Sequence, residues 1–156
     1  MKVYRISKAV YAKDLSGNGA RLYGGRWNSE GNFALYAAEN RALALVETLV
    51  HTPIKFLKSN PFLLIEIEIP LSAGILKMDL EGMPQEWDAY IPAPSTRKLG
   101  DAFLAEQKHL LLQVPSVLMP EECNYVINPL HGDMKHVKVL EVRLLTFNDR
   151  LLQSLK

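Results

Sequence analysis

The chain is poor in the features that mark several special classes of protein. It has one cysteine, Cys123, so no intrachain disulfide can form and a reducing compartment is expected. Its apolar runs, such as residues 62–65 and 110–112, are far too short to span a bilayer. With 18 basic and 17 acidic residues, the net charge of +1 lacks the basic excess that binds nucleic acids and anionic membranes. We therefore expect neither direct nucleic-acid binding nor membrane binding.

The signatures of common catalytic and metal sites are missing as well. Residues 17–22 depart from G-x-G-x-x-G because Leu22 replaces the third glycine, and no P-loop, H-E-x-x-H or C-x-x-C pattern occurs. The four histidines and the cysteine have no metal-ligand spacing, so we expect no metal site. The first residues, Met1–Ser7, resemble a strand and not a secretory signal, which favours a cytoplasmic protein.

The composition that is present is typical of a globular protein. An apolar fraction of 48% and a charged fraction of 22% over 156 residues predict a single domain, residues 1–156, with a real core. Hydrophobic periodicity predicts strands at residues 3–6, 33–37, 62–69, 75–78, 111–114, 124–127 and 137–145, and helices at residues 40–51, 95–110 and 149–156. These elements do not alternate regularly, which predicts a compact α+β domain with mixed or antiparallel sheets and few helices.

Several boundaries follow from single residues. Asn40 is expected to cap the first long helix and Pro53 to stop it, and Ser95 or Thr96 is expected to cap the second. Residues 13–25 contain four glycines and are expected to form a loop.

Arg26 is the first candidate for a functional residue, because it follows two glycines in the segment Gly24–Asn28. Arginine presents a rigid fork that matches phosphate or carboxylate oxygens, and flanking glycines let backbone N–H groups approach the same anion. The alternative is an exposed loop arginine without a ligand.

Tyr36 and Glu47 follow Arg26 at spacings of ten and eleven residues. Tyr36 closes an expected strand, where its ring could stack on a flat heterocycle or belong to the core of a sheet. Glu47 lies about 40° from Leu43 on a helical wheel, at the edge of the apolar face. Partial desolvation there tends to raise the pKa of a carboxyl group, which favours a functional role. The alternative is a rim carboxylate paired with His51.

A second cluster lies around Ser116. The hydroxyl of Ser116 could bind a ribose hydroxyl or orient a carboxylate, and Asn124, Asn128 and His131 add polar groups nearby. No nucleophile elbow surrounds Ser116, so a nucleophilic serine is not favoured. Ordinary turn chemistry explains the same residues as well.

Together these segments resemble the RES domain family, which is named for its arginine, glutamate and serine. The matching stretches are Tyr4–Ser7, Gly24–Asn28, Gly31, Leu35–Glu39, Ala42–Glu47, Leu99–Asp101, Val114–Ser116 and Asn124–His131. The family letters fall on Arg26, Glu47 and Ser116, with Tyr36 as a fourth functional position. Residues 51–98 match no motif.

The resemblance implies an ADP-ribosyltransferase-like fold and a toxin of a bacterial toxin–antitoxin pair that depletes NAD. It implies that a helix-turn-helix antitoxin of the Xre type holds the toxin inactive. NAD would be the substrate, with no separate cofactor. Glu47, Arg26, Tyr36 and Ser116 would be catalytic, and Arg5, Arg26, Tyr36, Ser116 and Asn124 would bind NAD.

The sequence is compatible with three hypotheses about the function. The acceptor of ADP-ribose could be water or phosphate, which gives an NAD-degrading enzyme, or a protein side chain, which gives a mono-ADP-ribosyltransferase. A non-catalytic interaction module is the third. An RNA-acting toxin is disfavoured by the near-neutral charge. A homodimer is also left open, because apolar residues near 110–114 and 144–152 could form core or interface.

Overall fold

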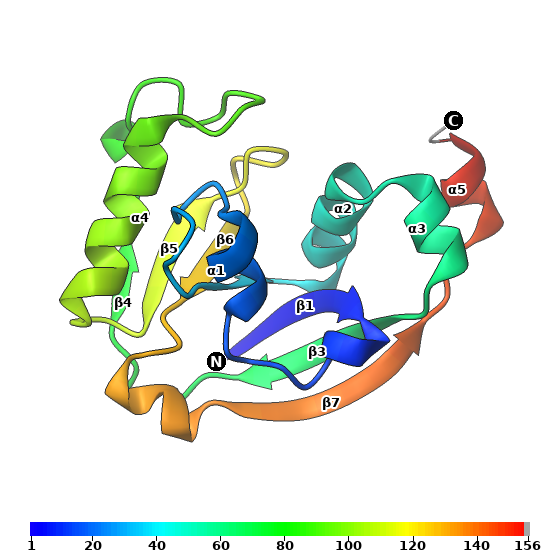
Figure 1. Ribbon diagram of the computed structural model, residues 1–156, viewed down its shortest axis with the longest axis horizontal. Helices are drawn as coiled ribbons and strands as arrows, with labels where there is room; N and C mark the ends of the chain where they lie inside the picture. Colours follow the sequence, from blue (N-terminus) through cyan, green and yellow to red (C-terminus); the bar gives the residue numbers. More distant parts are fainter. Residues whose placement is uncertain (155–156) are drawn as a thin grey trace.

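The computed structural model describes residues 1–154 (Figure 1). The strands are β1 (Lys2–Lys8), β2 (Leu35–Ala38), β3 (Phe62–Glu68), β4 (Ile75–Lys77), β5 (Leu111–Pro115), β6 (Cys123–Ile127) and β7 (Lys138–Leu145). The α-helices are α1 (Asn18–Tyr23), α2 (Arg41–His51), α3 (Ile54–Ser59), α4 (Pro94–Glu106) and α5 (Asp149–Ser154). Short 3-10 turns are η1 (Ala9–Tyr11), η2 (Leu80–Gly82) and η3 (Gly132–His136).

The strands form one mixed sheet in the order β4-β5-β6-β2-β1-β3-β7. β4 and β5 are parallel, and the other neighbours are antiparallel. All of β2 pairs with β6, whereas β2 meets β1 through the pair Ala38 and Tyr4. The sheet therefore has two halves, β4-β5-β6-β2 and β1-β3-β7, joined at one narrow place. This mixed sheet with separate helices confirms the expected α+β class.

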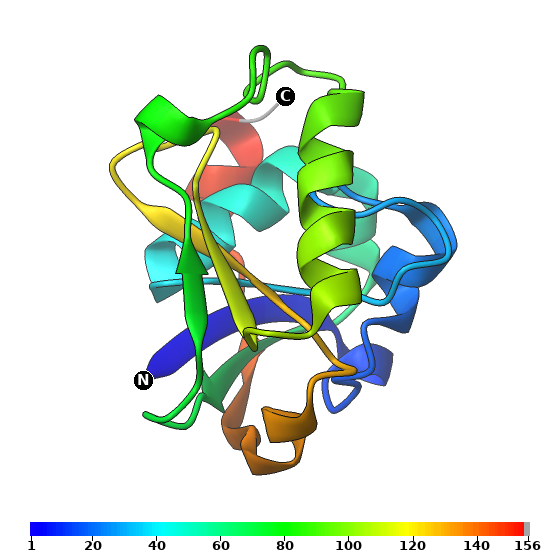
Figure 2. The ribbon, with the colours of Figure 1, turned by 90° about the vertical axis from the view of Figure 1, so that its left-hand side faces the viewer.

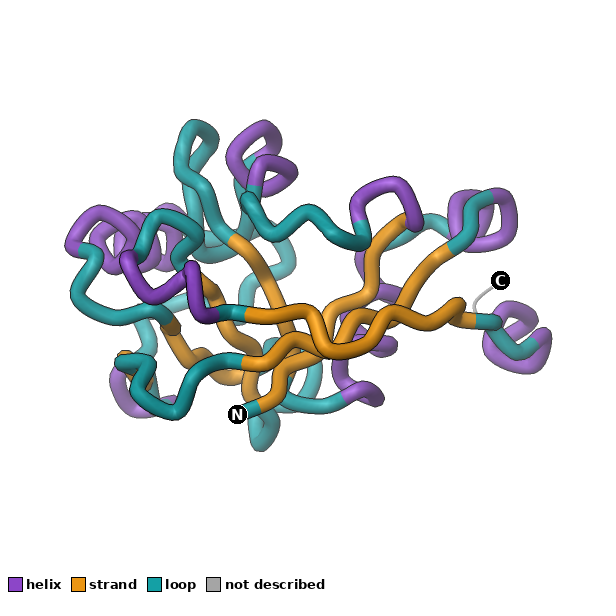
Figure 3. The backbone as a smooth tube through the Cα atoms, turned by 90° about the horizontal axis from the view of Figure 1, so that it is seen from below, coloured by secondary structure: helices purple, strands orange, loops and turns teal. Residues whose placement is uncertain are grey.

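Both halves of the sheet contribute to one core, and two helices pack on the sheet. The shared core contains Val3, Ile65 and Ile67 from one half and Leu35, Leu111, Tyr125 and Ile127 from the other. In the second cluster Phe103 and Leu104 of α4 pack on β5 and β6, and in the third Leu43 and Ala44 of α2 pack on β1, β2 and β3. Figure 2 shows α4 lying against β5 and β6, and Figure 3 shows the strands running through the middle with the helices around them. α4 thus covers β5 and β6, and α2 covers the place where the two halves of the sheet meet.

The apolar segments near residues 110–114 and 144–152 were predicted to form either core or interface, and the structure shows that they differ in exposure. Leu110, Leu111 and Leu112 are fully buried in the core. Leu144 on the edge strand β7 is 61% exposed. In the same segment Leu152 is buried, in a cluster with Leu57 and Phe62. A homodimer stays a prediction, for which Leu144 offers an exposed apolar side chain.

The segment 13–25, expected to be a loop, contains the short helix α1. Gly17 (φ 71°) precedes the helix and Gly24 (φ 67°) ends it, each in a left-handed conformation that glycine adopts without strain. The glycines therefore mark the two ends of a helix. The expectation of a loop was wrong because a glycine with a positive φ can begin or end a helix as well as interrupt one.

Proline likewise starts helices in this chain. α3 follows Pro53, which was expected only to stop the preceding helix. α4 begins at Pro94 with Ala93 as its N-cap, so neither Ser95 nor Thr96 is the cap. α4 ends at Glu106, because Gln107 adopts φ 50°, and Leu110 lies beyond it.

The predicted cap of α2 is confirmed. The side chain of Asn40 accepts a hydrogen bond from the N–H of Leu43 (2.8 Å). The last predicted helix is present as α5, and its expected final residues, Leu155 and Lys156, lie outside the described residues.

Candidate active site

The β2–α2 unit presents both Tyr36 and Glu47, one on the strand and one in the second turn of the helix. β6 lies beside β2, and its Asn124 pairs with Ala38 on one side and with Val114 of β5 on the other. Ser116 directly follows β5. The sheet register therefore brings Asn124 and Ser116 to α2, although they are 77 and 69 residues away from Glu47 in the sequence.

Glu47 is the centre of this hydrogen-bond cluster. Its Oε1 accepts from the hydroxyl of Ser116 (2.9 Å) and from the side-chain amide of Asn124. Its Oε2 lies 3.4 Å from Nε2 of His51, one turn further along α2. Glu47 thus pairs with His51 and contacts Ser116 at the same time. The two interpretations of Glu47 are therefore compatible.

The surroundings keep Glu47 ionised. Burial alone would raise its pKa, but hydrogen bonds from His51, Asn124 and Ser116 outweigh burial and hold the pKa below its ordinary value. The sequence-based expectation of a raised pKa was wrong, because the donors come from parts of the chain that a helical wheel cannot show. A carboxylate of this kind serves as a fixed negative charge and not as a proton donor at neutral pH.

Replacing His51 with Ala is expected to move the acid limb of the activity profile to higher pH. The expected catalytic role of Glu47 needs its ionised form, so the rate should be full above the pKa of Glu47 and fall as the pH drops through it. That pKa lies below 4.5 in the intact protein and rises when the hydrogen bond from His51 is lost while burial remains. The measurement is kcat/KM against pH, with His136→Ala as the matched control on η3. An acid limb that does not move would show that His51 does not act on Glu47.

Ser116 is fully buried and holds Glu47 in place. Its hydroxyl donates to Glu47 and accepts from the N–H groups of Leu118 (3.1 Å) and Met119 (3.3 Å). The backbone N–H of Ser116 donates to the carbonyl of Glu122 (2.8 Å). Ser116 therefore orients the carboxylate, which is one of the two roles that the sequence left open.

Arg26 is half-buried, and its terminal nitrogens contact a distant loop. Nη1 donates to the carbonyl of Trp87 (2.7 Å) and Nη2 to that of Ala89 (2.9 Å). Burial lowers the pKa of Arg26, while the negative charges of Glu47 and Asp88 oppose that effect. An arginine remains protonated through such a shift. Arg26 is thus a half-buried charged group near Glu47 and not a fully exposed one.

Tyr36 supports the Arg26 segment through its hydroxyl. The hydroxyl accepts from the N–H of Trp27 (3.0 Å) and donates to Oδ1 of Asn28 (2.7 Å). Burial raises the pKa of Tyr36 well above its usual range, so the hydroxyl keeps its proton. A Cβ on Gly25 would lie 2.6 Å from this hydroxyl, which explains a glycine there. The hydroxyl is fully used by the protein, and only the ring is left to meet a ligand.

Replacing Tyr36 with Phe is expected to lower the free energy of unfolding by about 1–3 kcal/mol, the cost of leaving buried polar groups without a partner. The groups affected are the N–H of Trp27 and the side-chain oxygen of Asn28. Urea denaturation measures the loss, and Tyr23→Phe on the exposed face of α1 is the matched control. Equal stability of the two variants would contradict the bridging role of the Tyr36 hydroxyl.

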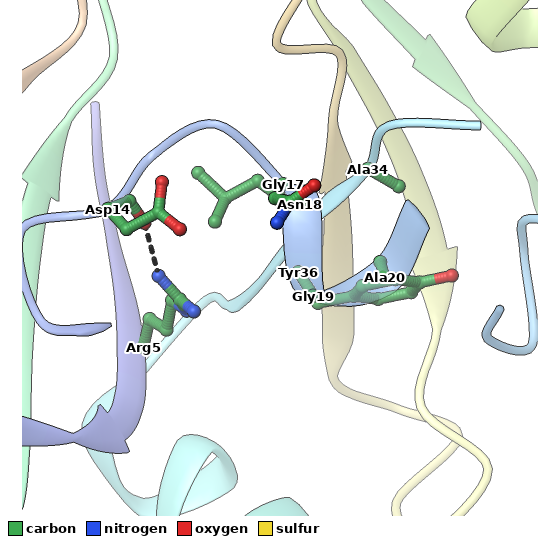
Figure 4. A pocket seen from close by; sticks show the side chains of 9 residues that line it. Arg5, Asp14, Gly17, Asn18, Gly19, Ala20, Ala34 and Tyr36 are labelled. Carbon is green, nitrogen blue, oxygen red and sulfur yellow. Dashed lines mark hydrogen bonds between the residues drawn. The ribbon is translucent and has the colours of Figure 1, made fainter. Parts of the chain in front are cut away.

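Arg5 and Tyr36 line a small cavity of about 110 Å³ between β1, β2 and the start of α1. Figure 4 shows Arg5 and Asp14 on one side of the cavity and Tyr36 with Gly19 and Ala20 on the other. Nη1 of Arg5 donates to the carbonyl of Asp14 (2.8 Å), and burial lowers the pKa of Arg5. The cavity lies where β2 leaves β1 to pair with β6, so the divergence of the strands makes room for it.

The structure therefore brings Glu47, Ser116 and Asn124 into direct contact, and Arg5 and Tyr36 to one cavity. Asn128 and His131 belong to neither group. The side-chain amide of Asn128 donates to the carbonyl of Leu104, and Nδ1 of His131 accepts from the N–H of Asp133 and so caps η3. The sequence analysis missed Asn28. This residue is buried, and its side-chain amide donates to the carbonyls of Ala20, Ser29 and Asn32. Its place in the matched segment Gly24–Asn28 was the available signal.

Asp101 is a second missed residue. Its carboxylate accepts from the N–H and the hydroxyl of Ser29 and from the side chain of Asn32, which fixes the segment after Arg26 on α4. No group of His, Cys, Asp and Glu side chains suited to a metal ion occurs among the described residues. Within residues 1–154 no helix has the length and apolar character needed to cross a membrane.

Fold and site together define an α+β protein in which an ionised, hydrogen-bonded glutamate lies near a charged arginine. The sequence matches the RES domain over residues 2–148, and the chain belongs to the RES domain family. The resemblance inferred from the motifs is thereby confirmed.

Named relatives cover nearly all of the chain. It is 40% identical over 150 residues to the Prs ADP-ribosylating toxin of Sphingobium sp. (strain YBL2), covering 95% of this chain and 92% of that protein. It is 35% identical over 159 residues to Toxin Res of Photorhabdus laumondii subsp. laumondii, covering all of both chains. The expectation of an NAD-acting enzyme agrees with the first name, because ADP-ribosylation consumes NAD.

A solved structure shares the fold. The toxin–antitoxin complex MbcT–MbcA of M. tuberculosis contains a chain that superposes with a TM-score of 0.78 at 20% identity, covering 99% of this chain and 87% of that one. At this identity the likeness confirms the α+β fold and carries no residue roles.

Proposed function

We propose that this protein is the toxin of a type II toxin–antitoxin pair and that it cleaves NAD at the bond between nicotinamide and ribose. The observation that carries the proposal is the Glu47 carboxylate, kept ionised by Ser116, Asn124 and His51. The toxin names of the Sphingobium and Photorhabdus relatives support the biological role.

The chemistry needs a fixed negative charge more than a proton donor. When the bond from C1′ to the nicotinamide nitrogen breaks, its electron pair stays on nitrogen and neutralises the pyridinium ring. No general acid is therefore required. Positive charge develops on the ribose, by analogy with glycoside cleavage, and a carboxylate beside it lowers the barrier. An acceptor oxygen then bonds to C1′ and loses its proton.

Each neighbouring residue has a part in this scheme. Arg26 binds the pyrophosphate or adjoining ribose, and Arg5 assists from the cavity between β1 and β2. The ring of Tyr36 stacks on nicotinamide while its hydroxyl fixes the Arg26 segment. Ser116 and Asn124 orient Glu47 and extend polar contacts to the ribose.

The acceptor distinguishes two activities. Water or phosphate makes the protein an NAD glycohydrolase or phosphorylase. A protein side chain makes it a mono-ADP-ribosyltransferase, which the name of the Sphingobium relative favours as the second candidate. NAD labelled in its adenylate half separates them: free ADP-ribose or its phosphorylated form supports degradation, and label retained on protein supports transfer.

We further propose neutralisation by a helix-turn-helix antitoxin of the Xre type, in the cytoplasm. Expression of the parent chain in bacteria is expected to arrest growth and lower cellular NAD, and Glu47→Gln is expected to abolish both effects. Arrest by both chains with unchanged NAD would favour the non-catalytic interaction module. Normal growth of cells that express the parent chain fully would contradict the toxin role.

A further inference from the structure

The terminal nitrogens of Arg26 are already occupied in the free protein. They donate to the carbonyls of Trp87 (2.7 Å) and Ala89 (2.9 Å), which lie 61 and 63 residues away. These acceptors belong to residues 83–93, here called the 83–93 loop, between η2 and α4. An anion that approaches Arg26 must therefore share or replace these partners.

The 83–93 loop is anchored at its base and loosely packed at its tip. Met83 and Trp87 pack against the core below α4. The tip exposes large apolar side chains, with Tyr90 98% and Ile91 75% exposed. The N–H of Trp87 donates to the carbonyl of Pro84 and that of Ala89 to the carbonyl of Glu86, but these bonds stay within the loop. The two hydrogen bonds from Arg26 tie the loop to the rest of the protein, so we expect them to order its tip.

The backbone of the loop also holds some strain. Glu86 adopts φ 60°, a left-handed conformation that a residue with a side chain adopts only at a cost. It lies next to Trp87, whose carbonyl binds Arg26. The strained turn and the arginine contacts are therefore coupled, and loss of the contacts would let the turn relax.

We propose that Arg26 latches the 83–93 loop in the free protein, and that a pyrophosphate group releases the loop by taking over the Arg26 donors. A pyrophosphate oxygen adds full charge attraction and a bidentate fit to the guanidinium, which a neutral backbone carbonyl lacks, so the anion displaces the carbonyls. The inference rests on the proposed function in one respect, that NAD supplies the pyrophosphate. The loop contact is then an autoinhibitory one that the substrate itself removes.

Hydrogen–deuterium exchange of residues 85–91 tests the latch, with inorganic pyrophosphate as the probe. Pyrophosphate has no base or ribose for the loop to cover, so release is seen as faster exchange. We expect exchange at least ~10-fold faster, the scale of a hydrogen bond to a charged group. Potassium chloride at equal ionic strength is the control, and the strands β3 and β7 are expected not to respond.

The variant Arg26→Lys keeps the positive charge of the side chain but removes the planar guanidinium group. Lysine cannot bridge two carbonyls in the same rigid geometry, so this variant is expected to show fast loop exchange without any ligand and no further response to pyrophosphate. Slow exchange in Arg26→Lys would overturn the latch.

The remaining outcomes are equally decisive. Pyrophosphate that binds by calorimetry without faster loop exchange overturns the proposal, and so does the absence of binding at millimolar concentration. NAD cleavage without a loop response leaves the proposed function and removes the latch. A loop response in a protein that does not cleave NAD retains the latch as an anion switch and removes the proposed function.

Discussion

Replacing Glu47 with Gln is expected to reduce the turnover of NAD by at least ~100-fold, the scale on which electrostatic stabilisation is lost at a catalytic centre. The substitution keeps the shape of the side chain, and its oxygen can still accept from Ser116 and Asn124. What it removes is the negative charge that faces the developing positive charge on the ribose. The loss should therefore fall on kcat more than on KM.

Steady-state kinetics with a matched control variant decide this prediction. Glu106→Gln changes an exposed carboxylate at the end of α4 that pairs with Lys108 (3.1 Å), and it should leave turnover unchanged. Near-parental turnover by a folded Glu47→Gln protein would eliminate Glu47 as the catalytic carboxylate.

Replacing Gly100 with Ala is expected to damage both stability and activity. Gly100 in α4 packs so closely on the Arg26 segment that an added Cβ would lie 1.8 Å from the carbonyl oxygen of Trp27. The clash is with backbone, so α4 or the segment that carries Arg26 must move. Overpacking of this kind costs about 1–3 kcal/mol or more, and a displacement near 1 Å at the site could cost ~100-fold in rate.

Gly19→Ala provides the control for this substitution. Gly19 lies in α1, also beside the site, but a Cβ there meets no atom within 4 Å. Urea denaturation and kcat/KM of the two variants give a direct comparison. If Gly100→Ala is as stable and active as Gly19→Ala, the close packing of α4 on the Arg26 segment does not matter to the site.

The sequence was enough to propose candidate site residues, but their contacts could not be predicted from it. The wheel position of Glu47 indicated a carboxylate at the edge of a buried face, and the structure leaves it partly buried. Its partners Ser116 and Asn124 come from β5 and β6, and strand order is not encoded in any local period. Only the family resemblance placed them in the same site before the structure did.

Arg26 illustrates the limit most clearly. Its residue type and its glycines pointed to an anion, whereas the structure shows it bound to the carbonyls of Trp87 and Ala89. Backbone carbonyls have no sequence signature, and residues 51–98 match no motif. Glycine and proline misled in the opposite direction: Gly17 and Gly24 lie at the two ends of a short helix in a segment that was expected to be a loop, and Pro53 precedes a short helix that was not expected.

The most direct test of the central claim is the release of nicotinamide from NAD by the purified chain, followed with and without phosphate and with a bacterial lysate as a source of protein acceptors. We expect the parent chain to release nicotinamide in at least one of these conditions, and Glu47→Gln to release at least ~100-fold less. The condition that supports release then names the acceptor. Intact NAD in all three conditions, with a correctly folded parent chain, would contradict NAD cleavage as the activity of this site.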